Sequence, residues 1–376
     1  MKRFCGFITG FVFFISGILK LMDPVGTGLI IKEYLEFLHI TFLNVASKQA
    51  GVAFALAEVI LGTGLITGVW RKAVAFATIC FQSFFTVLTL LLVTFKPEMD
   101  CGCFGEALHL SHEQTFTKNL IILALLLIYY IPARHLGQTK SRKYVSFGIV
   151  TASVIAFTIF SCIHIPLNDY TDYHSGVSLK GELASNSYQA VFRYEKDGIQ
   201  KTFNIDNLPD STWTFVSTET INTGDDATAA ALSFHDLNGI DADSLALKGK
   251  VFIISIYDTD IREKDRQQIL SFAERAEQAG FKSIVLSSSA IDFPDNTNSF
   301  IADYKTLITF NRSNGGATYI NDGLIISKWS KKSLPDTKEL AKIYNEDVTE
   351  TIIGNSRSSL AFQGFLLYVF AVMLLL

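Results

Sequence analysis

The chain has 376 residues, of which 49% are hydrophobic and only 18% are charged, and its formal net charge is −4. A typical soluble chain carries about 25% charged residues, so this composition points away from a wholly soluble protein. The negative charge, together with the lack of a basic cluster interleaved with aromatic residues, argues against nucleic-acid binding. The long apolar runs fall within residues 1–165 and 359–376, while residues 166–357 have the composition of a water-soluble domain.

Six segments are long and apolar enough to span a bilayer, which takes about 20 residues. They are residues 4–22, 47–69, 73–95, 116–133, 144–164 and 359–376. The first follows Lys2 and Arg3, as in a signal peptide, but no small-residue cleavage site comes after it, so we expect a retained helix. We predict a four-helix membrane bundle over residues 1–136, with 144–164 and 359–376 as two further transmembrane helices.

Basic residues in the short loops predict the orientation, because Lys and Arg favour the cytoplasmic side. They lie before the first span, between the second and third spans, and in residues 134–143 between the fourth and fifth spans. These three positions fall on one side of the membrane. We therefore expect a multi-pass inner-membrane protein with both termini cytoplasmic, an outward loop over residues 23–46, and a periplasmic domain over residues 165–358.

Glu58 lies midway along the second predicted span, on one helix face with Gly51, Ala55 and Gly62. A charge at the bilayer centre costs about 2.5–3.5 kcal/mol even on insertion scales, so such residues commonly face a bundle interior. One interpretation is a functional carboxylate on a proton, ion or ligand path. The other is a protonated Glu58 that bonds a neighbouring helix, with three candidate partners: Gln82, Thr86 and Thr89.

Lys20 is near the outer end of the first span. A lysine at such a position can extend its charged end to the membrane interface. We expect it to do so and to need no functional role.

A cysteine pair follows the third span on its predicted outer side, in the run Asp100-Cys101-Gly102-Cys103-Phe104-Gly105. Gly102 permits the bend that a disulfide between residues two apart requires. Such a small ring is strained, and strained exposed disulfides tend to be labile or catalytic. Three interpretations stay open: redox exchange, a structural staple of the loop, and a metal site.

Other residues extend these interpretations. Cys162, near the outer end of the fifth span, is a candidate relay for the pair, whereas Cys5 and Cys80 are expected to be buried apolar residues. A metal site would combine Cys101 and Cys103 with His109 and His112, a ligand set that suits zinc or copper. The spacing matches no common zinc pattern, and the histidines also fit as polar loop residues before the fourth span. No metal is favoured.

The first four spans resemble DoxX-like/MauE-like membrane proteins, particularly a long form found in Bacteroidota. The resemblance covers about residues 4–135 and is carried by the run 16–26, by Glu58, by the cysteine motif at 100–105 and by the run 115–119. It implies a four-helix membrane bundle. MauE is associated with methylamine utilisation, where it is thought to help mature a disulfide-rich subunit. DoxX-type proteins are linked to quinone-coupled thiol or sulfur oxidation.

The outer region, residues 166–357, is predicted to hold two parts. Residues 188–217 have a strand pattern that includes a hairpin. Residues 245–350 give a strand, a helix and a strand, then a hairpin and a closing helix, an order that resembles an α/β thioredoxin-like fold. The Cys-x-x-Cys of such enzymes is missing after the first core strand, where Tyr257 begins a cysteine-free stretch. This degenerate domain is expected either to bind a partner or to form a structural cap.

Two functional hypotheses follow. In the first, Cys101 and Cys103 cycle between dithiol and disulfide, and electrons leave through the bundle to a quinone near Glu58, in support of a periplasmic protein or small-thiol substrate. No other cofactor is indicated. In the second, the protein is a non-catalytic membrane-anchored scaffold in which the cysteine pair only fixes the loop. The outward position and the glycine spacer favour the first, and the cysteine-free outer domain favours the second.

Overall fold

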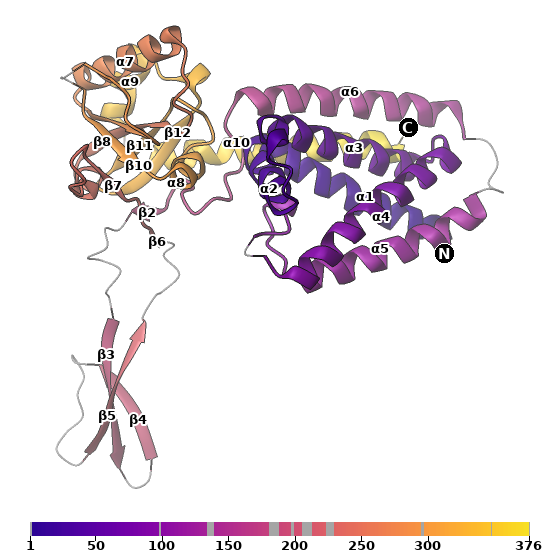
Figure 1. Cartoon of the computed structure of the whole chain (residues 1–376), viewed down its shortest axis with the longest axis horizontal. Coiled ribbons are helices and arrows are strands. Elements are labelled where there is room, and N and C mark those ends of the chain that lie inside the picture. The colour runs from indigo at the N-terminus through magenta and orange to yellow at the C-terminus, as the bar shows by residue number, and fades with distance from the viewer. Residues whose placement is uncertain are drawn as a thin grey trace.

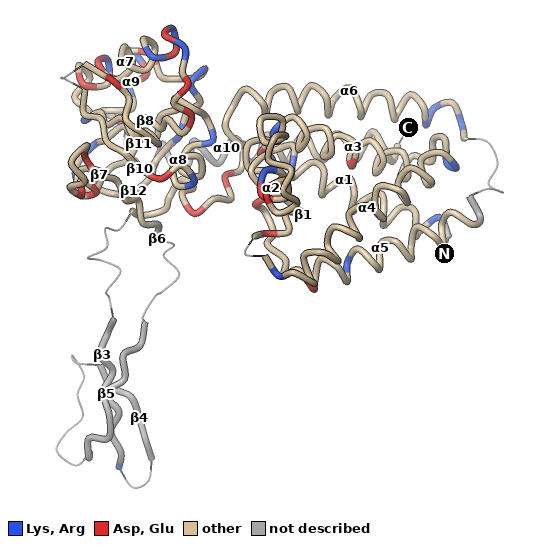
Figure 2. Tube along the Cα trace, viewed as in Figure 1, with Lys and Arg blue, Asp and Glu red and all other residues tan. Residues whose placement is uncertain are grey.

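The computed structural model describes residues 2–97, 99–133, 139–179, 188–196, 199–204, 213–222, 229–294, 297–346 and 348–375. Figure 1 shows a helical bundle, a compact outer domain at one end of it, and a separate sheet that extends from the outer domain. Both chain termini lie at the far end of the bundle. Figure 2 shows Lys and Arg at this same far end, so the predicted basic loops and the termini share one end of the bundle, although residues 134–138 of the third basic loop lie outside the described residues.

Seven helices build the bundle. They are α1 (Lys2–Met22), α2 (Pro24–Phe37), α3 (Ser47–Thr67), α4 (Arg71–Phe95), α5 (His112–Ala133), α6 (Ser141–Ile163) and α10 (Val348–Leu375). Within the described residues, five segments are long and apolar enough to cross a membrane: Arg3–Met22, Thr41–Thr67, Arg71–Phe95, His112–Ile131 and Ser141–Ile163. The sixth predicted span corresponds to the shorter apolar stretch Leu360–Leu375 of α10.

The outer faces of these helices are apolar. Phe76, Val87 and Ile131 are each more than half exposed, as side chains that face lipid would be. The sequence and the structure therefore both indicate a multi-pass protein that is embedded in a lipid bilayer.

Helices α1 and α3 pack closely through small residues, as helices that associate in lipid commonly do. A Cβ atom added to Gly17 would lie 2.7 Å from the Ala55 carbonyl oxygen, and one added to Gly10 would lie 2.8 Å from the Gly62 carbonyl oxygen. An apolar cluster joins α1 and α3 to α4 and α5, and a second joins them to α6 and α10. The backbone contact of α1 with α3 is what brings their polar side chains together.

The outward loop predicted for residues 23–46 is more structured than expected, because it contains α2 and a short 3-10 helix, Thr41–Ala46. Asp23 caps α2 by accepting a hydrogen bond from the Gly26 amide at 2.9 Å, and Pro24 supplies the fixed φ that suits a first helical residue. The α2 helix packs against α3 and against residues 100–106, which are called the cysteine segment below. It covers the end of the bundle that lies next to the outer domain.

The outer domain is built on a mixed eight-stranded sheet with the strand order β6-β2-β12-β11-β8-β9-β10-β7. Its strands are β2 (Ser178–Leu179), β6 (Ala229–Ala230), β7 (Phe234–His235), β8 (Lys250–Ile256), β9 (Lys282–Ser287), β10 (Ser299–Ala302), β11 (Gly316–Asn321) and β12 (Leu324–Trp329). Strands β8, β9 and β10 are parallel, and β11 and β12 form the antiparallel hairpin.

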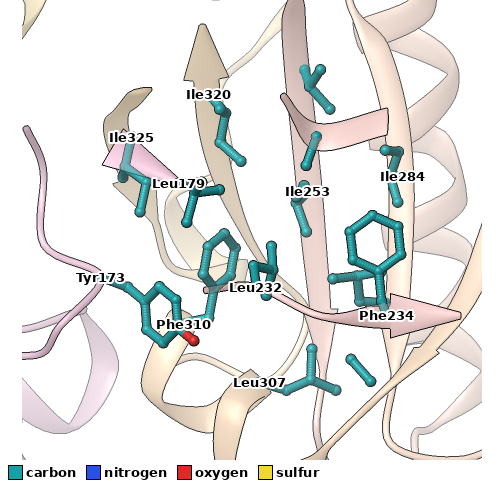
Figure 3. Close-up of a cluster of buried hydrophobic side chains, with 14 of the residues drawn as sticks. Tyr173, Leu179, Leu232, Phe234, Ile253, Ile284, Leu307, Phe310, Ile320 and Ile325 are labelled. Atoms are coloured by element: carbon teal, nitrogen blue, oxygen red, sulfur yellow. The ribbon is translucent and has the colours of Figure 1, made fainter. Parts of the chain in front are cut away.

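Helices cover both faces of this sheet. Helices α7 (Glu263–Gln278) and α9 (Thr337–Asn345) pack on one face, where Phe252 and Phe272 are fully buried. Helix α8 (Tyr304–Phe310) packs on the other, in the cluster that Figure 3 shows around Phe310 and Ile253. Short 3-10 helices span Asp243–Ala246 and Lys331–Ser333. The strand, helix, strand, hairpin and closing helix predicted from the sequence are all found, while β10 and α8 between β9 and the hairpin were not predicted.

A separate three-stranded antiparallel sheet has the order β4-β3-β5. Its strands are β3 (Tyr188–Lys196), β4 (Ile199–Asn204) and β5 (Thr214–Asn222). The predicted hairpin pairs Val191 with Asn204 and Lys196 with Ile199. The strands extend beyond the predicted limit at residue 217, and residues 197–198 and 205–212 of that prediction lie outside the described residues.

Candidate functional site

A cavity lies inside the bundle between α1, α2, α3, α4 and α5, and the cysteine segment closes it. Its walls are largely apolar and aromatic, with Phe13, Phe54, Phe81 and Phe85 among them. Its polar lining comes from Ser16, Lys20, Thr27, Tyr34, Glu58, Gln82, Thr89, Lys118 and Asn119, and its thiols from Cys101 and Cys103. About 70 Å³ is open to the centres of water-sized molecules, which is several times what one water needs.

The cysteine turn is held by backbone geometry and by α2. Gly102 has φ +60°, and a Cβ atom there would lie 2.4 Å from Cγ2 of Ile30, so the turn accepts only glycine without distortion. The Tyr34 hydroxyl donates a hydrogen bond of 3.0 Å to the Cys101 carbonyl oxygen. Burial raises the pKa of Tyr34, which keeps this hydroxyl protonated and able to donate.

The two cysteines have different surroundings. Cys101 is only 5% exposed, and its burial raises the pKa of its thiol. Cys103 is half-buried and is the first residue of the short strand β1 (Cys103–Glu106). Both are free thiols in this structure. Cys103 is therefore the more accessible thiol of the two.

Glu58 and Lys20 form an ion pair within the cavity. The Lys20 ammonium contacts Oε1 of Glu58, and both side chains are nearly buried. The expectation that Lys20 extends to the interface is therefore wrong, while the expectation that it needs no functional role stays a prediction. The reason is the close crossing at Gly17, three residues before Lys20, which places this face of α1 against Glu58.

Ser16 joins this ion pair to the cysteine segment. Its hydroxyl lies 2.7 Å from Oε2 of Glu58 and 2.7 Å from the Cys103 carbonyl oxygen. A hydroxyl has a single proton to donate, so it donates to one of these oxygens at a time. A chain of direct contacts thus runs from Lys20 through Glu58 and Ser16 to the backbone of Cys103.

The three partners predicted for Glu58 bond elsewhere. The Gln82 side-chain amide donates to the Asn119 carbonyl oxygen at 3.2 Å, and the Asn119 side chain donates to the Thr89 hydroxyl at 3.1 Å. The Thr86 hydroxyl donates to its own helix, at the Gln82 carbonyl oxygen. The bonds of Gln82 and Thr89 with Asn119 join α4 to α5, although Gln82 and Thr89 also line the cavity.

The predicted metal ligands are not brought together. The His109 ring lies 3.2 Å from Oδ2 of Asp100, and the His112 ring bonds the Met99 carbonyl oxygen at 2.9 Å. No group of three or more His, Cys, Asp and Glu side chains suited to a metal ion is found within the described part of the chain. The four-residue metal set at Cys101, Cys103, His109 and His112 is therefore not assembled here.

Cys162 is exposed at the end of α6 and is not among the described residues that line the cavity. The structure does not bring this candidate relay into the site. Its role as a relay stays a prediction.

Arg312 anchors the outer domain to the bundle beside the cysteine segment. It is 6% exposed, and its guanidinium bonds Oδ2 of Asp23 at 2.9 Å and Oε1 of Glu106 at 2.7 Å. Its third contact is the Ile308 carbonyl oxygen at 3.2 Å. Sequence reasoning missed this residue, because a single Arg in the polar run before β11 carries no signal of its distant partners.

Two further contacts support the docked position. Lys305 of α8 bonds Glu33 of α2 at 3.1 Å, and Lys32 lies 4.9 Å from the centre of the Tyr304 ring. The outer domain therefore meets the bundle at α2 and at the cysteine segment.

Comparison with known proteins finds a family that the bundle resembles. Residues 2–132 match the family described as methylamine utilisation protein MauE. The cavity-lining residues named above all fall within this match. The bundle is MauE-like. Neither this match nor the relative described next tests the likeness to DoxX, which stays a prediction.

The remaining comparisons are less specific. Protein TlpB of Flavobacterium psychrophilum is 27% identical over 172 residues, which cover 44% of this chain and 45% of that relative. The chain thus aligns with less than half the length of this curated relative. Residues 188–222, which hold the three-stranded sheet, match a domain of unknown function. No solved structure matches the chain.

Proposed function

We propose that this MauE-like protein performs thiol–disulfide chemistry at Cys101 and Cys103 and passes the electrons to a quinone in the bundle cavity. The observation that carries the proposal is that both cysteines line one cavity with Glu58, inside the MauE-like region. The aromatic walls suit an apolar ring, and the few polar groups suit the orientation of its oxygens.

Oxidation of the two thiols is coupled to reduction of the quinone. Cys101 and Cys103 each lose a proton, and together they lose two electrons as the S–S bond forms. The two electrons and two protons reduce a quinone to a hydroquinone. The disulfide then oxidises a dithiol on a periplasmic protein or a small thiol by exchange through a mixed disulfide at Cys103. Under this proposal, the protein lies in the inner membrane, and its cysteine segment and outer domain face the periplasm.

The outer domain is proposed to bind the protein whose thiols are oxidised. Its order of βαβ unit, hairpin and helix supports a thioredoxin-like fold, and the printed sequence places no cysteine in residues 166–357. A domain without thiols cannot exchange disulfides itself. Its docked position beside Cys103, through Arg312, suits presentation of a partner to the membrane site.

Thiol trapping in growing cells tests this proposal. Membranes are acid-quenched and alkylated, and mixed disulfides are sought in Cys101→Ser, Cys103→Ser and Cys162→Ser proteins. In Cys101→Ser, Cys103 can still attack the disulfide of the oxidised partner, which is the reverse of the proposed exchange, but no Cys101 thiol is left to release it. We therefore expect this protein to accumulate a mixed disulfide with a periplasmic protein. Cys162→Ser is the matched control, since it removes an exposed thiol at the outer end of α6 and should leave the wild-type pattern. A pair that stays oxidised throughout, with no trapped partner, would contradict the proposal.

The second candidate function is a membrane-anchored scaffold with a structural cysteine pair. The buried Arg312 contacts favour it, because they fix the cysteine segment without any need for redox change. Under this function, the Cys101→Ser/Cys103→Ser protein should lose stability but no partner should be trapped. The same trapping experiment therefore separates the two.

A further inference from the structure

We propose that Lys20 and Glu58 are the proton-transfer pair of the cavity, with Lys20 as the group that gives a proton to the oxygen of the bound quinone. This inference rests on the proposed function and assigns a chemical role to two residues of its site. It starts from the ion pair itself, which the helix pattern alone did not predict. The contact joins α1 and α3 at the inner wall of the cavity.

The pair is costly for a purely structural contact. A charge within a membrane helix is costly to insert, and a buried ion pair is often no more stable than an apolar pair of the same volume. Helices α1 and α3 already pack through Gly10, Gly17 and Gly62 without it. An apolar pair would serve packing equally well, so the retained charges indicate chemistry.

Lys20 and Glu58 lie close to the cysteine segment and also face the cavity in which the quinone is proposed to bind. Lys20 and Glu58 line the same cavity as the two cysteines, and the Ser16 hydroxyl lies 2.7 Å from both Oε2 of Glu58 and the Cys103 carbonyl oxygen, so it can donate to either one. Among the described residues, the other titratable groups that line the cavity are Lys118 on α5 and Tyr34 on α2, while α4 contributes only neutral side chains. Tyr34 is committed to the Cys101 carbonyl oxygen, and Lys118 lies 4.8 Å from the Phe104 ring.

The proton balance of the step needs such a pair. Formation of the S–S bond releases two protons, and conversion of a quinone to a hydroquinone takes up two, inside walls that are mostly apolar. Lys20 donates a proton as negative charge develops on the oxygen beside it. Glu58 holds the ammonium in place and receives protons that the cysteines release, which restore Lys20 for the second transfer. Lys20 and Glu58 return to their starting state, so the net reaction is that of the cysteines and the quinone.

The test separates two properties of Lys20: its ability to give up a proton and its positive charge opposite Glu58. Lys20→Arg keeps a cation opposite Glu58, but a guanidinium does not lose its proton in proteins. The double variant Lys20→Met/Glu58→Gln removes both charges together, so neither buried charge is left unpaired. Thr63→Val is the matched control, because Thr63 is buried in α3 with an unbonded hydroxyl and is not among the cavity residues.

Each full-length protein is reconstituted in lipid nanodiscs and reduced. The loss of the Cys101 and Cys103 thiols is then timed with decylubiquinone, a quinone of the required class, and with diamide, a soluble thiol oxidant that needs no quinone site. General acid–base groups typically contribute factors of about 100 to 10,000. We expect Lys20→Arg and the double variant to be at least about 100-fold slower with decylubiquinone and within about twofold of wild type with diamide, while Thr63→Val matches wild type with both.

The outcomes are distinguishable. If either variant reacts with decylubiquinone at the wild-type rate, Lys20 is not the proton donor and this inference is overturned, while the proposed function stands. If the wild-type protein reacts with diamide but not with decylubiquinone, the proposed oxidant is wrong, and the inference that rests on it fails as well.

Discussion

Nη2 of Arg312 lies 2.7 Å from Oε1 of Glu106, three residues after Cys103. Arg312 belongs to the segment between α8 and β11, and Glu106 ends the short extended segment that begins with Cys103. The outer domain is therefore bonded directly to the backbone segment that carries a candidate redox thiol. Any partner that moves the outer domain acts on this segment through Arg312.

Loss of this anchor should loosen the cysteine segment. Arg312→Met leaves the carboxylates of Asp23 and Glu106 without their cation, and breaking a buried ion pair in this way typically costs about 3–5 kcal/mol. We expect faster amide hydrogen exchange in residues 100–108 and 23–28 of the full-length protein.

Lys305→Ala is the control for this experiment. It removes an exposed cation from the same interface, where the cost should be no more than about 1 kcal/mol. Equal exchange rates in the Arg312→Met and wild-type proteins would show that the outer domain does not hold the segment.

The turn between the cysteines should tolerate no side chain. Gly102→Ala places a Cβ atom against Ile30 at a backbone φ of +60°, so both the contact and the conformation oppose it. We expect the thermal midpoint to fall and the rate of disulfide formation by diamide to change severalfold. Gly148→Ala is the matched control, because no atom lies within 4 Å of its added Cβ and its helical conformation suits alanine. Equal effects of the two substitutions would show that the turn adapts.

The membrane helices were predictable because their signal is local. Long apolar runs and basic loops each act within one segment, so within the described residues five of the six predicted spans are found as helices long and apolar enough to cross a membrane. Glu58 was predictable as a special residue for the same reason, since a carboxylate in an apolar helix stands out by itself.

The partners of these residues were not predictable, because pairing depends on how helices cross. Lys20 lies near a helix end, where a lysine can reach water, and only the close approach at Gly17 turns it toward Glu58. The contact of Arg312 with Asp23 joins residues 289 positions apart, and no pattern in a single sequence links them. Alternating and helical periodicities gave the outer-domain elements in order, yet they carried no information on which face meets the bundle.

The thiol of Cys101 should be slow to react at neutral pH. Its burial raises the pKa above the ordinary thiol value of about 8.5, so the reactive thiolate is a smaller fraction at any lower pH. In a Cys103→Ser protein whose other cysteines are also serine, we expect the rate of iodoacetamide alkylation to keep rising above pH 9, where a free thiol levels off. Measurement by intact mass over pH 6–11 checks this. A rate profile whose midpoint lies at or below pH 8.5 would mean that the thiol is not shielded in this way.

The link between α6 and the outer domain should be sensitive to acid. Burial alone would raise the pKa of the Asp169 carboxyl. The Lys328 ammonium, 2.6 Å away, nevertheless holds this pKa below its usual value. A carboxyl whose pKa is lowered by folding stabilises the fold above its unfolded pKa of about 4, and this contribution is lost as the pH falls through the lower folded value. Asp169→Asn should therefore destabilise the protein near pH 7 and flatten the decline of its thermal midpoint below pH 4.

A double variant shows whether this effect comes from the pair. Asp169→Asn alone leaves the buried Lys328 without its counter-charge, whereas Asp169→Asn/Lys328→Met removes both charges together. We expect the double variant to recover part of the stability that the single variant loses at pH 7. Thermal midpoints in detergent between pH 3 and pH 7 measure both effects. The single variant Lys328→Met completes the comparison. If the double variant is no more stable than the summed losses of Asp169→Asn and Lys328→Met predict, the two residues do not stabilise the fold as an ion pair.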